Sequence, residues 1–213
     1  MKTPEAVDRA LKRGATHIGF IFFEKSPRYI EPDLAAKLAE PARGKAKIVA
    51  VVVDATNDEL DEIVSLLKPD ILQLHGSESP EHVLTIKALY GLPVMKVFSV
   101  RTADDLKRVE PYIGIADRFL FDAKAPKGSE LPGGNGISFD WSLLGWIDES
   151  IDYMLSGGLN KNNVADALAN TRARGIDVSS GVESAPGVKS VAMIDEFFDA
   201  VETADAPVMA SGS

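Results

Sequence analysis

Two short apolar segments in the last third of the chain each end in serine and glycine. Residues 153–158 read Tyr-Met-Leu-Ser-Gly-Gly, and residues 176–181 read Ile-Asp-Val-Ser-Ser-Gly. A stretch that predicts a helix follows each of them. Glycine after a strand leaves backbone N–H groups open beside the positive end of a helix dipole, and this arrangement binds phosphate. One such unit would more simply be a tight turn, but two consecutive units favour a phosphate site. Its predicted residues are Gly157, Gly158, Ser180 and Gly181.

Polar side chains that could do chemistry follow several other apolar runs. Asp122 comes directly after Phe-Leu-Phe at residues 119–121, and an apolar surround would raise its pKa toward a value suited to a general acid. Arg28, in a Ser-Pro-Arg loop, is suited to a carboxylate, although a surface ion pair is the commoner role. His75 ends another run, where a ligand contact and a core histidine satisfied by the backbone both fit. The other polar residues at predicted strand ends are Asp54, Gln73, Lys96, Ser99 and Asp177.

The composition limits the classes of function. The 213 residues contain 23 Lys and Arg against 32 Asp and Glu, a net charge of −9 that argues against nucleic acid as a partner. Cysteine is absent, so the chain has no disulfide, thiolate metal site or cysteine nucleophile. No spacing of His, Asp and Glu predicts a metal, and no glycine motif predicts a nucleotide cofactor. No leader peptide or apolar run of membrane length is visible, so we expect a cytoplasmic protein without membrane contact.

The elements that must position these residues alternate between apolar strands and helices. Nearly continuous apolar runs predict strands buried on both faces, as in a parallel sheet. These runs occupy residues 16–23, 47–53, 70–76 with its turn, 92–98, 117–122, 153–155 and 176–178. Helices are predicted near residues 3–13, 31–40, 57–67, 79–90, 102–109, 141–146, after 163 and at 191–201, with a glycine-rich loop at 123–138.

The position of the phosphate glycines favours one architecture. A doubly wound sheet more often carries them after its first strand, whereas a parallel barrel carries them after its last two. We therefore expect a (β/α)8 barrel over residues 1–203, followed by a disordered tail at residues 204–213. Only seven strands are predicted, and the chain opens with a helix where a barrel should open with a strand.

A set of short motifs, taken together, resembles phosphoribosylanthranilate isomerase, a family of the tryptophan pathway. The motifs are Gly-Phe-Ile-Phe at 19–22, Ser-Pro-Arg-Tyr-Ile at 26–30, Leu-Gln-Leu-His-Gly at 72–76, Leu-Phe-Asp-Ala-Lys at 120–124, Gly-Gly-Asn-Gly at 133–136, Phe-Asp-Trp at 139–141, Leu-Ser-Gly-Gly-Leu at 155–159, Asp-Val-Ser-Ser-Gly-Val-Glu at 177–183 and Pro-Gly-Val-Lys at 186–189. The resemblance extends to about residue 201. It implies a (β/α)8 barrel that converts N-(5-phosphoribosyl)anthranilate into 1-(2-carboxyphenylamino)-1-deoxyribulose 5-phosphate by an Amadori rearrangement, without a cofactor.

The resemblance also implies roles for single residues. Asp122 would be the general acid that protonates the ribose ring oxygen and opens the ring to a Schiff base. Arg28 would hold the anthranilate carboxylate. His75 is taken as a substrate contact from its place at a strand end and not from the resemblance. Asp177 would lie beside the anthranilate amino group or the sugar, and the two glycine turns would hold the phosphate. The implied partner is a small phosphosugar, bound by a monomer or a homodimer.

One departure from the family concerns its first strand. Members begin with a strand of the type Lys-Ile-Cys-Gly-Leu, whose cysteine is the general base at C2 of the sugar. This chain starts where the first family helix begins, with Met1-Lys2-Thr3-Pro4. The first strand and its cysteine are therefore expected to be missing, and turnover by this chain to be impaired.

Two other interpretations stay open at this stage. One is a different phosphosugar barrel enzyme, such as an epimerase, although metal-using epimerases need His and Asp ligands at several strand ends. The other is a degenerate barrel that binds a phosphorylated ligand without turning it over. Such a barrel would keep the phosphate glycines and lose the base.

Overall fold

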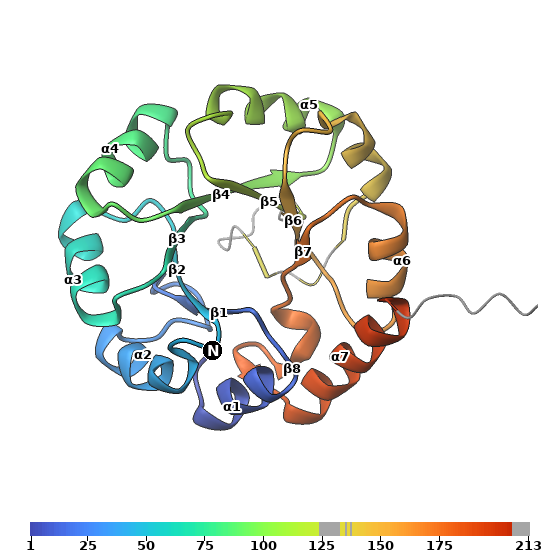
Figure 1. The fold of residues 1–213 in the computed structure, drawn as a ribbon, viewed down its shortest axis with the longest axis horizontal. Coiled ribbons are helices and arrows are strands. Elements are labelled where there is room, and N and C mark those ends of the chain that lie inside the picture. The colour runs from blue at the N-terminus through green and yellow to red at the C-terminus, as the bar shows by residue number, and fades with distance from the viewer. Residues whose placement is uncertain (124–132, 135, 137, 206–213) are drawn as a thin grey trace, which may run out of the picture.

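Seven parallel strands form one curled sheet in the computed structural model, which describes residues 1–123, 133–134, 136 and 138–205. Within these residues the strands neighbour one another in chain order, and every neighbouring pair is parallel. They are β1 (His17–Ile21), β2 (Lys47–Val52), β3 (Ile71–Leu74), β4 (Val94–Val100), β5 (Arg118–Ala123), β6 (Tyr153–Leu155) and β7 (Gly175–Ile176). Figure 1 shows the sheet curling around the centre of the molecule. The predicted parallel barrel architecture is confirmed.

The helices form a ring outside the sheet (Figure 1). The α-helices are α1 (Pro4–Lys12), α2 (Pro32–Ala39), α3 (Asn57–Leu67), α4 (Pro80–Tyr90), α5 (Ala103–Leu106), α6 (Val164–Asn170) and α7 (Val191–Asp205). The 3₁₀ helices are η1 (Glu40–Ala42), η2 (Lys107–Tyr112), η3 (Trp141–Trp146) and η4 (Ser180–Val182). Several starts follow local sequence: Thr3 caps α1, and Thr56 and Glu59 form a capping box at α3.

The side chains of each strand alternate between two apolar layers. In β1, Ile18 and Phe20 are buried in the layer between sheet and helices, whereas His17, Gly19 and Ile21 face the inside of the barrel. This outer layer is continuous from β1 to β4 and again from β4 to α7. A separate cluster lies inside the barrel. It consists of Met95, Val97, Leu120 and Met154.

The segment after the second glycine turn differs from the prediction. Instead of a helix, the chain makes the single turn η4 and then an antiparallel hairpin of β8 (Glu183–Ala185) and β9 (Val188–Lys189), before α7 begins. Pro186 and Gly187 explain the hairpin, because proline lacks the N–H that a helix needs and Gly187 has a φ of 81°, which favours glycine. The prediction that a helix dipole acts at this turn is therefore wrong.

The predicted helix at residues 102–109 is also shorter than expected. Regular α-helical structure ends at Leu106 and continues as the 3₁₀ helix η2, which contains Pro111. Two other predictions fall partly outside the described residues. The glycine-rich loop is described only at residues 123, 133–134, 136 and 138, and the tail only at residues 204 and 205.

The strand ring and the helix ring differ where the first and last elements meet. Within the described residues, no strand pairs with the outer edge of β1 or of β7. The helices α1 and α7 nevertheless lie side by side at this position (Figure 1). Arg13 of α1 donates hydrogen bonds to the carboxylates of Asp195, Asp199 and Glu202, and its guanidinium lies 5.5 Å from the centre of the Phe198 ring.

Candidate active site

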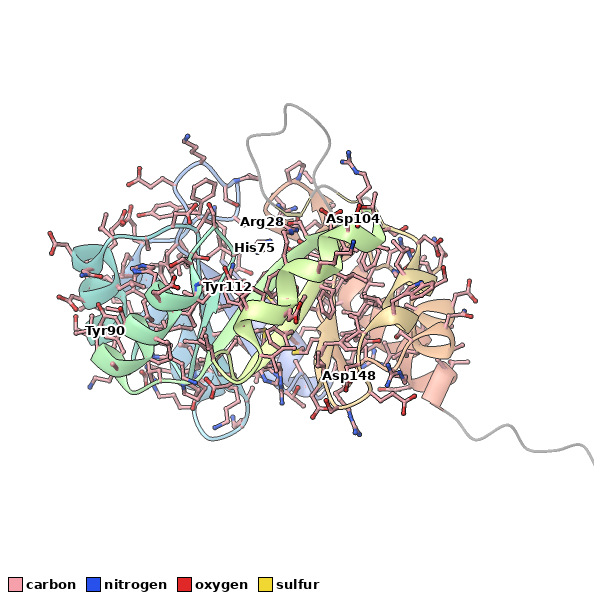
Figure 2. The ribbon with its side chains drawn as sticks, turned by 90° about the horizontal axis from the view of Figure 1, so that it is seen from above. Arg28, His75, Tyr90, Asp104, Tyr112 and Asp148 are labelled. Carbon is pink, nitrogen blue, oxygen red and sulfur yellow. The ribbon has the colours of Figure 1, made fainter. Side chains whose placement is uncertain are left out.

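The carboxyl ends of the strands surround a cavity of about 620 Å³. It reaches from the barrel mouth down between β1 and β7 to side chains of α1 and α7. Figure 2 shows Arg28 and His75 at the same end of the barrel, with Asp148, which precedes β6, at the opposite end. The predicted site residues that line the cavity are Arg28, His75, Asp122, Gly157, Gly158, Asp177 and Ser180.

Asp122 and His75 face each other at the mouth. Asp122 is only 4% exposed, and its Oδ1 accepts a hydrogen bond of 2.8 Å from the N–H of Ala123. Its Oδ2 lies 3.4 Å from His75 Nε2. No hydrogen-bond partner for that buried nitrogen is found among the described residues, so the pair is close but not aligned. Catalytic contacts are often long without substrate and tighten when it binds.

Gly133 and Gly134 cover these side chains. A methyl group on Gly133 would collide with Asp122 Oδ2 and with the His75 ring, and one on Gly134 would collide with the Arg28 guanidinium. Gly134 also has a φ of 71°. The backbone can approach the polar groups this closely only because both positions are glycine. The two residues thus form part of the roof of the site.

Arg28 is held in a buried ion pair. Its Nε donates to Glu183 Oε1 at 2.9 Å and its Nη2 to Glu183 Oε2 at 2.7 Å, the bidentate geometry that suits a guanidinium and a carboxylate. Both side chains are less than a tenth exposed, at 8% and 3%. The alternative of a surface ion pair is therefore excluded. Nη2 also donates to the carbonyl of Gly134 at 3.3 Å, so Arg28 joins the roof to the β8–β9 hairpin.

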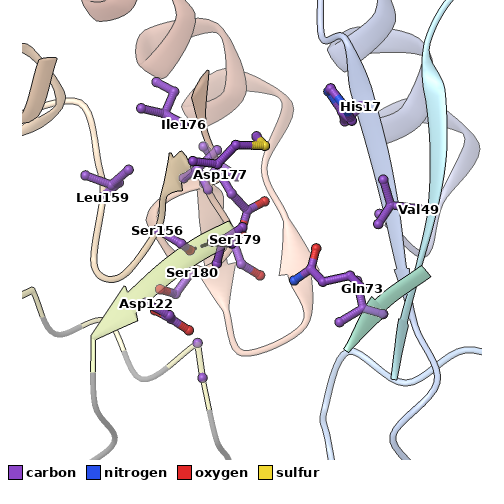
Figure 3. Close-up of a pocket in the computed structure, with 18 of the residues that line it drawn as sticks. His17, Val49, Gln73, Asp122, Ser156, Leu159, Ile176, Asp177, Ser179 and Ser180 are labelled. Atoms are coloured by element: carbon purple, nitrogen blue, oxygen red, sulfur yellow. Dashed lines mark hydrogen bonds between the residues drawn. The ribbon is translucent and has the colours of Figure 1, made fainter. Parts of the chain in front are cut away.

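Asp177 lies inside the barrel just after β7. Its Oδ2 accepts a hydrogen bond of 3.0 Å from Ser156 Oγ (Figure 3), and Figure 3 also shows Gln73 reaching toward it across the cavity. Burial raises the pKa of Asp177, the hydrogen bond from Ser156 opposes this, and the nearby charge of Asp122 adds to the rise. The charge of Asp122 thus acts on Asp177 within the same cavity.

The two glycine turns pack against each other. A methyl group on Gly181 would collide with the carbonyl of Leu159, so glycine at this position lets the second turn lie against the first. Gly181 does not itself line the cavity. Gly157 and Gly158 have φ values of 93° and 63°, which favour glycine. None of the described residues accepts a hydrogen bond from the N–H groups of Gly157, Gly158, Ser180 or Gly181. Of these donors, the N–H groups of Gly157, Gly158 and Ser180 belong to residues that line the cavity.

Two other polar residues at strand ends, Asp54 and Lys96, make contacts elsewhere and do not take part in the site. Asp54 does not cap a helix, because its Oδ1 accepts from the N–H of Ser77 at 2.6 Å and thereby holds the next loop. Lys96 is 2% exposed and donates to Glu78 Oε2 at 3.0 Å and to the carbonyl of Gly76 at 2.8 Å. Neither lines the cavity.

Sequence reasoning missed several residues that the fold brings to the cavity. Glu183 and Lys189 stand out, because both are buried charges in contact with predicted site residues. Their position on either side of Pro186-Gly187, directly after a glycine turn, is a signal that could have found them. Ser156 also lines the cavity, as does Gln73, which the sequence had already placed at a strand end.

Among the described residues, no group of three or more His, Cys, Asp or Glu side chains is arranged to hold a metal ion. Over the same part of the chain, none of the helices has the length and apolar character needed to cross a bilayer.

Comparison with known proteins gives consistent results. Residues 1–200 match the family model of N-(5'-phosphoribosyl)anthranilate (PRA) isomerase. The N-(5'-phosphoribosyl)anthranilate isomerase of Rhizobium etli (strain CFN 42) is 94% identical over 213 residues, which cover 100% of this chain and 96% of the relative.

Two solved structures share the fold and the family name. The phosphoribosyl anthranilate isomerase of Thermotoga maritima has a TM-score of 0.84 and 32% identity, covering 95% of this chain and 96% of the other. A second phosphoribosyl anthranilate isomerase, solved in complex with reduced 1-(o-carboxyphenylamino)-1-deoxyribulose 5-phosphate, has a TM-score of 0.81 and 30% identity, covering 95% of each chain.

Proposed function

This chain belongs to the N-(5'-phosphoribosyl)anthranilate isomerase family of tryptophan biosynthesis. From this membership we propose a role in the reaction for each candidate residue at the barrel mouth. The substrate is N-(5-phosphoribosyl)anthranilate, which carries a carboxylate at one end and a phosphate at the other. The observation that best supports the proposal is the convergence of Asp122, His75 and Arg28 on one cavity with the free N–H groups of the glycine turns.

Asp122 is the general acid. It protonates the ribose ring oxygen, the bond from C1 to that oxygen breaks, and the nitrogen lone pair forms the C1=N bond of the Schiff base. Loss of the C2 proton then gives an enolamine. Its C2 hydroxyl loses a proton as C1 gains one, which leaves a ketone at C2. Asp122 suits the first step because it is nearly buried and its Oδ2 lies 3.4 Å from His75 Nε2. His75 contacts the substrate beside it.

The two ends of the substrate need different partners. Arg28 holds the anthranilate carboxylate, which a planar guanidinium binds well. The N–H groups of Gly157, Gly158, Ser180 and Gly181 hold the phosphate. Because η4 has only three residues, the proposal rests on these free donors and not on a helix dipole. Asp177 lies beside the anthranilate nitrogen or the sugar.

Removal of the C2 proton is the step for which this chain has no family-type base. The family uses a cysteine thiolate there, and the 213 residues contain none. We therefore assign none of these 213 residues to this step. The second candidate, a barrel that binds a phosphosugar without turnover, predicts that no product forms. The two are told apart by measuring product formation under single-turnover conditions.

The general-acid role is tested in a chain extended before Met1 by a Lys-Ile-Cys-Gly-Leu strand. Asp122→Asn keeps shape and hydrogen-bond capacity but cannot give up the proton, so kcat should fall on the order of 10² to 10⁴-fold. The matched control is Asp152→Asn, because Asp152 is a solvent-exposed aspartate just before β6 that pairs with Arg174. A kcat for Asp122→Asn within a few-fold of the parent would refute the role.

The cellular setting and the assembly of the protein are proposals of the same kind. A phosphorylated, charged substrate does not cross a bilayer freely, and we propose that the enzyme works in the cytoplasm. We also propose that it is a monomer or a homodimer, which a solution mass measurement decides.

A further inference from the structure

We propose that Glu183 and Lys189 are positioning residues that hold the carboxylate-binding Arg28 and the turn at Ser179 to Gly181 at a set separation, a proposal that rests on the function proposed above. Arg28 and Ser179 come from loops on opposite sides of the open edge between β1 and β7. No strand pairing among the described residues joins these two edges. Their relative position must therefore be set by contacts other than strand pairing.

Glu183 supplies the first half of the connection. Besides the two hydrogen bonds from Arg28, its Oε2 accepts a hydrogen bond of 3.1 Å from the N–H of Gly187, and its Oε1 one of 2.9 Å from Lys189 Nζ. Each carboxylate oxygen thus has two donors. With this many partners the side chain has one defined position, and Arg28 is held with it. Of the guanidinium nitrogens, Nη1 keeps no partner among the described residues.

Lys189 supplies the second half. Its ammonium group also donates to the carbonyl of Ser179 at 2.8 Å and lies 3.3 Å from Ser179 Oγ. Ser179 directly precedes the predicted phosphate donors Ser180 and Gly181. One ammonium group therefore contacts the partner of Arg28 and the backbone of the phosphate turn. Its side chain is only 10% exposed, so it is not a mobile surface lysine.

The backbone of the hairpin makes the same connection. A methyl group on Gly187 would collide with the carbonyl of Pro27, so the hairpin turn presses directly on the loop that carries Arg28. Burial alone would raise the pKa of Glu183, but the hydrogen bonds from Arg28 and Lys189 outweigh it and hold the pKa below its ordinary value. The three side chains together carry one net positive charge, which favours an anionic ligand in a chain of net charge −9.

The test measures ligand affinity in the protein as it exists, because binding needs no catalytic base. The probe is reduced 1-(o-carboxyphenylamino)-1-deoxyribulose 5-phosphate, followed by calorimetry, with inorganic phosphate as a second probe. Glu183→Gln should weaken binding of the reduced analogue roughly 10-fold, because a hydrogen bond to a charged group contributes about that factor. Binding of inorganic phosphate should not weaken. The direction is diagnostic, because removal of a negative charge would by electrostatics alone strengthen binding of an anion.

Lys189→Met provides the second arm and leaves the pair of Arg28 with Glu183 in place. It should weaken binding of both probes, since Lys189 contacts the phosphate turn directly. The matched control is Lys87→Met, because Lys87 also donates to a backbone carbonyl and a carboxylate, those of Ile115 and Asp117, away from the cavity. Lys87→Met should change the affinity neither for the reduced analogue nor for inorganic phosphate. Thermal unfolding of each variant verifies that it is folded at the temperature of the measurement.

A double variant tests whether Glu183 acts through Arg28. Arg28→Met with Glu183→Gln should bind the reduced analogue no more weakly than Arg28→Met alone, because the two changes remove one interaction. Additive losses, or unchanged or tighter binding by Glu183→Gln, would overturn the positioning role and leave the proposed function intact. Failure of the unmodified chain to bind the reduced analogue would instead overturn the proposed function, and the positioning role with it.

Discussion

The ring of helices and the ring of strands differ at the point where the first and last elements of the chain meet. At the junction of first and last elements, α1 and α7 are joined by ion pairs and by an Arg13–Phe198 contact, whereas β1 and β7 are not paired with each other. A strand pairs only with a backbone about 4.8 Å away. Helices contact through long side chains, so they tolerate a much wider spacing.

The residues of the candidate site are held in place in two different ways, according to their position in the barrel. On the side of β3 to β6, strands with regular registers position His75, Asp122 and Ser156. At the open edge, Arg28 and the second glycine turn lack this support, and the β8–β9 hairpin connects them through Glu183 and Lys189. Side-chain contacts thus do at the open edge what backbone pairing does elsewhere in the barrel.

The largest expected effect comes from closing the strand ring. Adding a Lys-Ile-Cys-Gly-Leu strand before Met1 should pair the free edges of β1 and β7 and supply a thiolate at C2. Turnover of N-(5-phosphoribosyl)anthranilate should rise on the order of 10² to 10⁴-fold. The extended chain should also have the lower solution mass, since unpaired edges promote association.

A variant of the extension separates the two effects. With serine in place of the added cysteine, the strand still pairs but carries no thiolate, so the mass should fall without the gain in turnover. Equal turnover by the original and the cysteine-containing chains would mean that a residue already present acts as the base.

The second prediction concerns the glycine turn next to the open edge. Gly158→Asp would place a carboxylate where the phosphate is proposed to lie, and it should abolish calorimetric binding of the reduced analogue. Gly114→Asp is the matched control, since Gly114 also has a positive φ, 78° against 63°, but has open space around it. Unchanged affinity in Gly158→Asp would remove this turn from the phosphate site.

The third prediction opens the helix ring instead. Arg13→Ala removes the contacts from α1 to three acidic side chains of α7 and should lower Tm by a few degrees at low salt. The difference from the parent should shrink in high salt, because exposed charges are screened. Lys12→Ala, which breaks an exposed pair with Asp8 within α1, should leave Tm nearly unchanged. Equal Tm values for both variants would show that side-chain contacts do not close the ring.

The smallest expected effect is on the pH dependence of the free energy of unfolding. It concerns two carboxyl groups at the open edge, those of Asp177 and Glu183. The pKa of Asp177 is raised from its ordinary 3.8, so the folded state loses stability as pH rises from about that value through the folded pKa. The pKa of Glu183 is lowered from its ordinary 4.5, so its contribution is present above that value and is lost as pH falls through the folded pKa.

The two substitutions should therefore act in opposite directions at neutral pH. Asp177→Asn should raise the free energy of unfolding, and Glu183→Gln should lower it, in denaturant titrations at pH 7 and pH 4. The gap between Glu183→Gln and the parent should narrow at the lower pH. A change of the same sign in both variants would contradict the assignment.

Much of the architecture is readable from local sequence. The apolar runs predict every strand of the sheet, and capping residues such as Thr56 place helix starts accurately, because both signals act over a few residues. The catalytic and binding candidates were found for a related reason. The carboxyl ends of parallel strands meet at one end of a barrel, so residues such as His75 and Asp122 are brought together by topology alone.

What the sequence by itself determined about this protein is the alternation of strand and helix, its family and most of the candidate site. Only the tertiary structure decided which charged groups meet. Arg28 and Glu183 are 155 positions apart, and nothing in their local sequences predicts that they form a buried bidentate pair. The hairpin after Gly181 is different, because Pro186 and Gly187 signal it locally, but they do not indicate that Glu183 meets Arg28. Such contacts depend on the distance between two loops, which is set by the closure of the whole barrel and not by any segment of it.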